Sequence, residues 1–133
     1  MNKNRGFSLV EIMTVVVIIG ILVAIAWPSY QSQLRKGRRA NAQTYMSDIA
    51  NMQQQYLLDA RTYAPDFATL GKPAPTDLSP TFYTFAMTVA GPPPSFTITA
   101  TAVGQQVATG GAQGEDLTLT STGAKTRGGL PGW

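Results

Sequence analysis

The sequence contains no cysteine and no histidine among its 133 residues. Without cysteine no disulfide can form, so a small core loses one of its usual reinforcements. Without histidine the chain lacks the commonest general base and the commonest transition-metal ligand. Ser-His and Cys-His nucleophilic sites are excluded as well. We therefore expect a protein that is not an enzyme and that holds no metal and no cofactor.

Charged residues are also scarce, and they are unevenly placed. Ten basic residues face seven acidic ones, which gives a formal net charge of +3. Lys3 and Arg5 precede the first apolar run. Four further bases form a basic cluster: Arg35, Lys36, Arg38 and Arg39. A nucleic-acid binder more often shows a larger basic excess with interleaved aromatic residues. The basic cluster is either a solvated helix face or a contact to lipid headgroups or to acidic residues of a neighbouring chain.

The segment from Phe7 to Trp27 is almost wholly apolar and carries a single charge, Glu11. About 20 apolar residues are enough to span a bilayer as a helix. A plain signal anchor fits this pattern, and so does a cleaved secretory signal with Ala24 and Ala26 in A-x-A spacing. Neither explains Glu11, because a carboxylate in an apolar segment is costly unless it finds a partner. Glu11 is therefore a candidate functional residue.

The natural partner of Glu11 is a cation at a similar depth on another chain. Such a cation would arise if the chain were cut just before Phe7, because the new α-amino group would lie four residues before Glu11. This arrangement would let two copies of the helix pair in one alignment. Pro28 is expected to kink or open the helix, since it donates no backbone hydrogen bond, and Gly20 is a second weak point.

The stretch Gly6-Phe7-Ser8-Leu9-Val10-Glu11 resembles the class III signal of type IV prepilins. That signal is a short basic leader ending in Gly, followed by Phe and by Glu as the fifth residue of the mature chain. Gly20 and Pro28 also lie where pilins of this family carry a helix-loosening Gly and Pro. The resemblance implies that prepilin peptidase cleaves between Gly6 and Phe7 and methylates the amino group of Phe7. The methylated amine keeps its positive charge.

The same resemblance implies a structural subunit of a type IV pilus filament that serves adhesion, twitching motility or DNA uptake. It places the precursor in the inner membrane of a Gram-negative bacterium and the mature chain in an extracellular filament. The implied partners are other pilin subunits, prepilin peptidase and an inner-membrane assembly platform. Two alternatives stay open: a pseudopilin of a type II secretion machine, and a tip or surface subunit that contacts DNA or host surfaces. Four scattered bases would be the contacts of such a subunit: Arg61, Lys72, Lys125 and Arg127.

Beyond the membrane segment the pattern predicts an α+β pilin fold. Residues 1–6 would be the leader, 7–28 the transmembrane and polymerisation helix, 29–60 an amphipathic helix, and 61–133 a loop and sheet domain. The amphipathic stripe follows helical spacing and consists of Tyr30, Leu34, Ala42, Tyr45, Ile49, Met52 and Tyr56. Its expected partner is a small antiparallel sheet of three or four strands.

Period-two alternation predicts strands over residues 82–89 and 96–102 and around Leu117 to Thr120. Residues 61–80 are rich in proline and are expected to form a long connecting loop. Residues 103–115 are rich in Gly and Gln and are expected to form a mobile loop. Similar pilins usually close their C-terminal region with a disulfide, which this chain cannot form. Its C-terminal loop is therefore expected to be mobile or to be held by neighbouring subunits.

Overall fold

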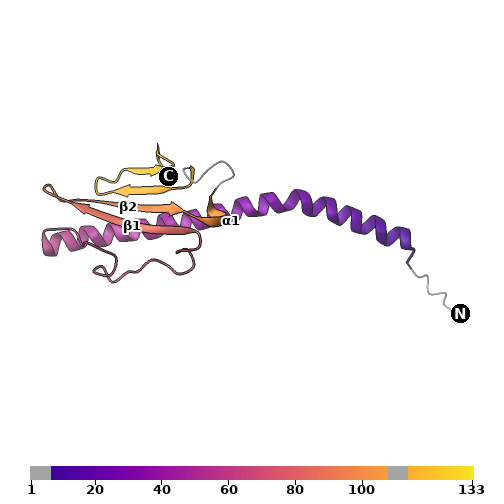
Figure 1. The fold of residues 1–133 in the computed structure, drawn as a ribbon, viewed down its shortest axis with the longest axis horizontal. Coiled ribbons are helices and arrows are strands. Elements are labelled where there is room, and N and C mark those ends of the chain that lie inside the picture. Colours follow the sequence, from indigo (N-terminus) through magenta and orange to yellow (C-terminus); the bar gives the residue numbers. More distant parts are fainter. Residues whose placement is uncertain (1–6, 108–113) are drawn as a thin grey trace. The chain divides into compact units, whose positions relative to one another are not determined.

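The computed structural model describes residues 7–107 and 114–133. The predicted leader, residues 1–6, lies outside the described residues, and so does the middle of the predicted loop, residues 108–113. The chain divides into two compact units, one ending at Leu34 and the other running from Arg35 to Trp133. Helix α1, Leu9–Ala60, contributes to both units, and the five strands belong to the second (Figure 1).

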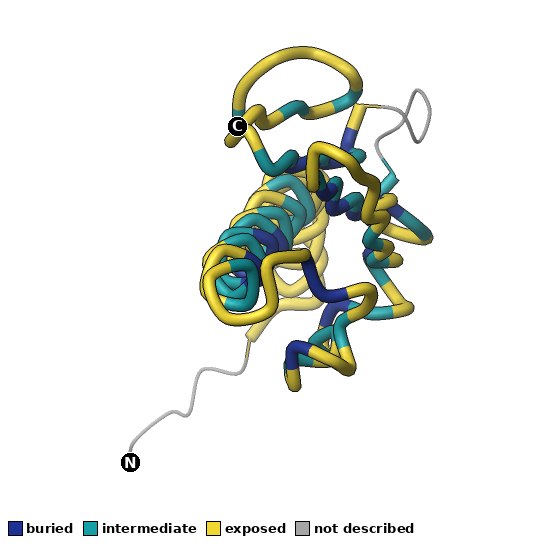
Figure 2. The backbone as a smooth tube through the Cα atoms, turned by 90° about the vertical axis from the view of Figure 1, so that its left-hand side faces the viewer, coloured by how far each residue is buried: buried dark blue, intermediate teal, exposed yellow. Residues whose placement is uncertain are grey.

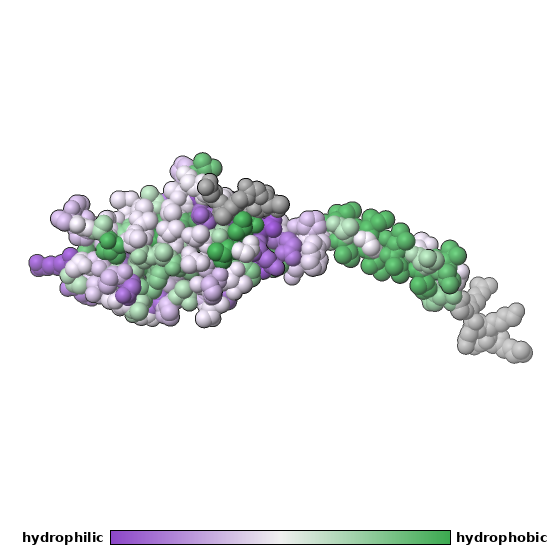
Figure 3. Space-filling view, viewed as in Figure 1, coloured by the Kyte–Doolittle hydropathy of each residue, from purple (hydrophilic) through white to green (hydrophobic). Residues whose placement is uncertain are grey.

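The first unit is the apolar part of α1. The helix is not interrupted at Gly20 or at Pro28, although proline removes one hydrogen bond from the helix ladder. Large apolar side chains are exposed along this part, from 47% at Val15 to 75% at Leu9, and Figure 3 shows the apolar surface that they form. Its length and composition are sufficient to cross a membrane. A helix that is apolar all round is stable only when lipid or protein covers it.

In the second unit, α1 packs one face against the sheet. The buried residues of this face recur at intervals of one, three or four positions, and they are Ala42, Tyr45, Met46, Ile49 and Gln53. Met52 and Tyr56 are partly buried beside them. The predicted stripe is confirmed at Ala42, Tyr45, Ile49, Met52 and Tyr56. Met46 and Gln53 are also buried, although the predicted stripe did not include them. Tyr30 remains 61% exposed, so the stripe begins later than its spacing suggested.

The sheet is a five-stranded antiparallel meander in the order β1-β2-β3-β4-β5. Its strands are β1 Tyr83–Ala90, β2 Ser95–Ala102, β3 Leu117–Thr120, β4 Lys125–Arg127 and β5 Leu130–Pro131. The predicted α+β arrangement and the three predicted strands are confirmed. Two short strands, β4 and β5, extend the sheet beyond the three or four strands expected, because the turn at Gly123 and the turn at Gly128 and Gly129 each reverse the chain within a few residues.

The two faces of the sheet differ in chemistry. Figure 2 shows the backbone coloured by burial, with buried positions in the sheet alternating with less buried ones. The buried apolar residues of three strands form the face toward α1, and they are Tyr83, Phe96, Ile98, Ala100, Ala102, Leu117 and Leu119. Threonines alternate with these residues, and the register aligns Thr99 with Thr118 and Thr118 with Thr126. One face therefore forms the core while the other is a threonine-rich outer surface.

The connection from α1 to β1 runs back along the helix toward its N-terminal side (Figure 1). Near its start, the buried side chain of Gln53 bonds both backbone groups of Ala64. Further on, the Tyr45 hydroxyl donates to the Lys72 carbonyl at 3.0 Å. The predicted long loop is thus irregular but anchored, because its polar backbone finds partners on the helix.

The C-terminal region makes several contacts within the same chain, and the mobility expected for its loop stays a prediction. Trp133 Nε1 donates to the Thr118 carbonyl at 3.2 Å, and the Lys125 ammonium lies 4.3 Å from the centroid of the Trp133 ring. The Gly132 N–H donates to the Lys125 carbonyl at 2.7 Å. Hydrogen bonds and a cation–π contact therefore take the place of a disulfide here.

The described ends of the 103–115 segment are also packed. Gln106 is fully buried and donates to the Arg35 carbonyl at 3.0 Å and to the Tyr83 hydroxyl at 3.1 Å. Glu115 is 4% exposed and accepts from Arg39 Nε at 2.8 Å. Both described ends therefore contact α1, and the mobility expected for the segment stays a prediction.

Candidate assembly and binding surfaces

Glu11 lies in the first turn of α1, and Phe7 lies just before the helix. Both residues are exposed, and no other acidic residue occurs in the apolar part of the helix. A negative charge in the first turn interacts favourably with the helix dipole, which offsets part of the cost of placing it in an apolar segment. Gly6 lies outside the described residues, so the structure does not place the predicted cleavage bond.

The basic cluster separates into residues with different surroundings. Arg39 forms a bidentate pair with the buried carboxylate of Glu115. The Arg38 guanidinium lies 3.7 Å from the centroid of the Phe82 ring. Lys36 is exposed, whereas Arg35 is half-buried. The cluster is therefore not one solvated face, because two of its four side chains serve the fold of the second unit.

The four bases predicted to contact DNA are spread along the second unit. Arg61 follows the last residue of α1, while Lys72 is bonded to Asp48 at 2.5 Å. Arg127 lies 3.3 Å from Glu115, the partner of Arg39. Between the levels of Arg39 and Arg61 the helix rises by roughly 33 Å at 1.5 Å per residue. The structure brings Lys125 and Arg127 together on β4 but separates this pair from Arg61.

The perturbed tyrosines are structural rather than catalytic. Burial raises the pKa of Tyr45 to about 12. Burial also raises the pKa of Tyr83, against a smaller opposite effect of its hydrogen bond with Gln106. Both hydroxyls are satisfied within the core and face no cluster of metal ligands. Among residues 7–107 and 114–133, no three His, Cys, Asp or Glu side chains lie close enough together to hold a metal ion.

Two family models match the chain in succession. Residues 1–27 match the prokaryotic N-terminal methylation motif. Residues 28–113 match the model described as "Type IV minor pilin ComP, DNA uptake sequence receptor". The two matches adjoin at Trp27 and Pro28, so together they cover most of the sequence.

Individual relatives agree with these family models. The chain is 32% identical to the fimbrial protein EcpC of Eikenella corrodens over 119 residues, which are 90% of this chain and 75% of that protein. It is 38% identical to the prepilin peptidase-dependent protein D of Escherichia coli over 91 residues, 68% of this chain and 60% of that protein. It is also 38% identical to the type IV major pilin protein PilA of Myxococcus xanthus over 66 residues. These are half of this chain but only 30% of the longer protein.

The exposed apolar helix and the sheet packed on its C-terminal part fit one class of protein, the membrane-anchored precursors of filament subunits. The chain belongs to the type IV pilin family, within the group described by the minor pilin ComP model. It is a structural subunit that assembles with other pilins into an extracellular filament, and it is not an enzyme.

Proposed function

We propose that prepilin peptidase cleaves the chain after Gly6 and methylates the amino group of Phe7. The subunit then passes from the inner membrane of a Gram-negative cell into the filament through an assembly platform. Support comes from the match of residues 1–27 to the N-terminal methylation motif. The observation that carries the proposal is Glu11, the one charge in the apolar first part of α1, where the large apolar side chains are exposed.

In this proposal Glu11 sets the alignment of neighbouring helices. The Phe7 ammonium of one subunit pairs with Glu11 of the next, which relieves the cost of a lone carboxylate in an apolar environment. Pairing occurs only at one axial offset, and fixing such a register is the best-attested role of a buried polar group. The apolar side chains from Val15 to Val23 supply most of the buried area, and Glu11 selects the alignment.

Gly20 and Pro28 would loosen the helix between them when the subunit enters the filament. Both residues weaken the backbone ladder, although α1 is continuous through them in the single chain. A density map of the assembled filament would show this segment as extended or poorly helical. A straight, unbroken helix from Ile21 to Ala26 in that map would contradict the loosening.

Substitution of Glu11 tests the proposal directly. We expect Glu11→Val to leave membrane insertion and cleavage intact but to lower the amount of mature subunit in sheared filaments by roughly tenfold or more, since loss of a desolvated pair typically exceeds 1.4 kcal/mol. Glu11→Asp keeps the charge and should lower incorporation less. Thr14→Val is the matched control, because it removes a polar group from the same apolar helix without removing a charge.

Two results would contradict the proposal. Wild-type incorporation of Glu11→Val would show that packing alone fixes the register. The intact mass of the assembled chain should correspond to a chain that starts at Phe7 and carries one added methyl group. Any other mass would refute the proposed cleavage and methylation. Scoring the variant itself rather than total filament keeps the test valid for a subunit present in few copies.

A second candidate function is DNA binding, which the match to the ComP family model favours. Lys125 and Arg127 alternate along β4 and are both exposed. Arg127 lies 3.3 Å from Glu115. Lys125 forms no ion pair within residues 7–107 and 114–133, so it is the base best placed for a phosphate backbone. Lys72 is already occupied by Asp48. Phosphate contacts release counterions, so binding should weaken steeply with salt.

The test is fluorescence polarisation of a labelled duplex with the full chain in detergent at several salt concentrations. We expect Lys125→Gln to weaken binding for all sequences and to reduce the salt slope by about 1. Lys72→Gln is the control that should change the slope little. Binding that is absent, or that is independent of salt, would reject this candidate without affecting the role in filament assembly.

A further inference from the structure

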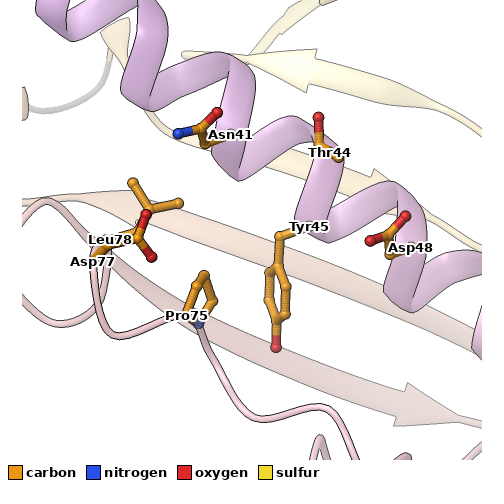
Figure 4. Close-up of a pocket in the computed structure, with 7 residues that line it drawn as sticks. All are labelled: Asn41, Thr44, Tyr45, Asp48, Pro75, Asp77 and Leu78. Atoms are coloured by element: carbon orange, nitrogen blue, oxygen red, sulfur yellow. The ribbon is translucent and has the colours of Figure 1, made fainter.

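A hollow of about 260 Å³ lies between α1 and the loop that runs back along it (Figure 4). Helix residues Asn41, Thr44, Tyr45 and Asp48 line it together with loop residues Pro75, Asp77 and Leu78. We call it the loop pocket. Pro75 is half-buried and supplies most of the apolar surface, beside small exposed parts of Leu78 and Tyr45, while two carboxylates supply negative charge.

The two carboxylates of the loop pocket differ in their partners. Asp48 is 2.5 Å from the Lys72 ammonium, and both side chains are partly exposed. Asp77 is exposed, and within residues 7–107 and 114–133 no basic side chain forms an ion pair with it. The pocket with Lys72 therefore carries a net charge of about −1 beside an apolar surface. A ligand that suits it combines an apolar group with a cation.

The end of α1 presents that combination. Leu58 is 83% exposed, which is the highest exposure of any large apolar side chain in the described chain. Arg61 is exposed just beyond the last residue of the helix, three positions after Leu58. We call this pair the helix knob. Neither side chain contributes to the core of its own unit.

Arg61 also has an unusual backbone. Its φ is +58°, the only positive φ of a non-glycine residue in the described chain. The residue after a helix often takes this left-handed conformation, but glycine or asparagine normally occupies it. A bulky residue is disfavoured in this conformation. Arg61 therefore occupies this position at the end of the helix despite an unfavourable local backbone conformation.

We propose that the helix knob of one subunit docks into the loop pocket of a second copy of this chain. Leu58 then covers Pro75 and Leu78, and the Arg61 guanidinium pairs with Asp77. The proposal rests on assembly into a filament, and it assigns a contact that the pairing of Phe7 and Glu11 does not provide. Two different patches meet, so the contact is heterologous and can repeat without closing, as a filament requires.

The axial offset places this contact on a different neighbour from the one that Glu11 meets. Arg61 lies 13 residues after Asp48 and 20 after Asn41, which corresponds to roughly 20–30 Å along the helix. Phe7 and Glu11 are four residues apart, or about 6 Å by the same rise. A helical filament gives each subunit neighbours at several offsets, so the two contacts are compatible.

Chemical cross-linking tests the contact, since the chain has no cysteine of its own. Arg61→Cys and Asp77→Cys are introduced together, and intact filaments are treated with a short bismaleimide. The two positions are too far apart along the helix to be joined within one chain, so we expect a ladder of dimers and larger species. Lys36→Cys with Asp77→Cys is the matched control and should give no ladder.

Charge exchange supplies a second, independent measurement. Arg61→Asp or Asp77→Arg alone should reduce incorporation into sheared filaments by roughly tenfold, because each brings like charges together. The two combined should restore incorporation to within about threefold of wild type, while Lys36→Asp combined with Asp77→Arg should not. The side chains of Arg61 and Asp77 are exposed, so the isolated subunit should keep its thermal midpoint.

The outcomes separate this inference from the proposed function. Filaments that form normally but give no ladder, or that ignore both charge reversals, would overturn the docking contact alone. A ladder from the Lys36 control, or cross-links only to a different pilin, would overturn it in favour of another occupant. Loss of DNA binding by Arg61→Asp with normal incorporation would assign Arg61 to DNA instead. Failure of the wild-type chain to enter filaments would overturn the proposed function itself.

Discussion

Gln53 anchors the start of the loop between α1 and β1, and its replacement by leucine should destabilise the second unit strongly. The Ala64 N–H donates to Gln53 Oε1 at 2.8 Å, and Gln53 Nε2 donates to the Ala64 carbonyl at 2.9 Å. Both residues are 0% exposed. One side chain thus satisfies both polar backbone groups of a buried residue.

The magnitude follows from the two orphaned backbone groups. A buried donor or acceptor without a partner costs about 1–3 kcal/mol. Gln53→Leu leaves two such groups, which lowers the free energy of unfolding by roughly 2–6 kcal/mol before any compensation. Apolar packing of the new side chain offsets part of this loss, and we expect a net decrease of about 2–4 kcal/mol in the free energy of unfolding. In a unit of this size that corresponds to roughly 10–25 °C in the thermal midpoint.

The assay is urea and thermal unfolding of the full chain in detergent, followed by the fluorescence of Trp133. A Trp27→Phe background leaves Trp133 as the single tryptophan, and its indole N–H contacts the carbonyl of Thr118 in the sheet. Gln55→Leu is the matched control, because it makes the same chemical change at an exposed position two residues away in α1. If the free energies of unfolding of Gln53→Leu and Gln55→Leu differ by less than about 0.5 kcal/mol, the reasoning from buried backbone groups is refuted.

Two further predictions concern charge and pH. Glu115→Gln should lower the free energy of unfolding by about 2–4 kcal/mol, because it breaks a buried pair with Arg39. Arg127→Gln should lower the free energy of unfolding by less than about 1 kcal/mol, since that side chain is 43% exposed. Equal effects of the two substitutions in urea unfolding would contradict this ranking. Burial raises the pKa of Tyr45 to about 12 from an ordinary value of 10.0, so the unfolded chain loses this proton first as pH rises. Stability should therefore be constant below pH 10 and fall toward pH 12. Absorbance titration of tyrosinate alongside circular dichroism checks this, and a fall already complete below pH 9 would contradict it.

The sequence alone determined the features that follow from local pattern. The uninterrupted apolar run predicted a helix that must be covered by lipid or protein, because its hydropathy does not depend on any distant residue. Period-two alternation located β1, β2 and β3 for the same reason. The motif around Gly6, Phe7 and Glu11 indicated the pilin family, which the family models then matched.

Only the tertiary structure decided which polar residues are buried. Gln53, Gln106 and Glu115 carry no apolar signal, yet each is buried and bonded to a residue outside its own local segment. The same applies to the basic cluster, where Arg39 turned out to be a partner of Glu115, 76 residues away. The knob at Leu58 and Arg61 and the loop pocket near Asp77 were likewise invisible in the sequence. Their complementarity depends on where the chain leaves the helix and how it runs back along it, which are positions set by long-range contacts rather than by any local spacing.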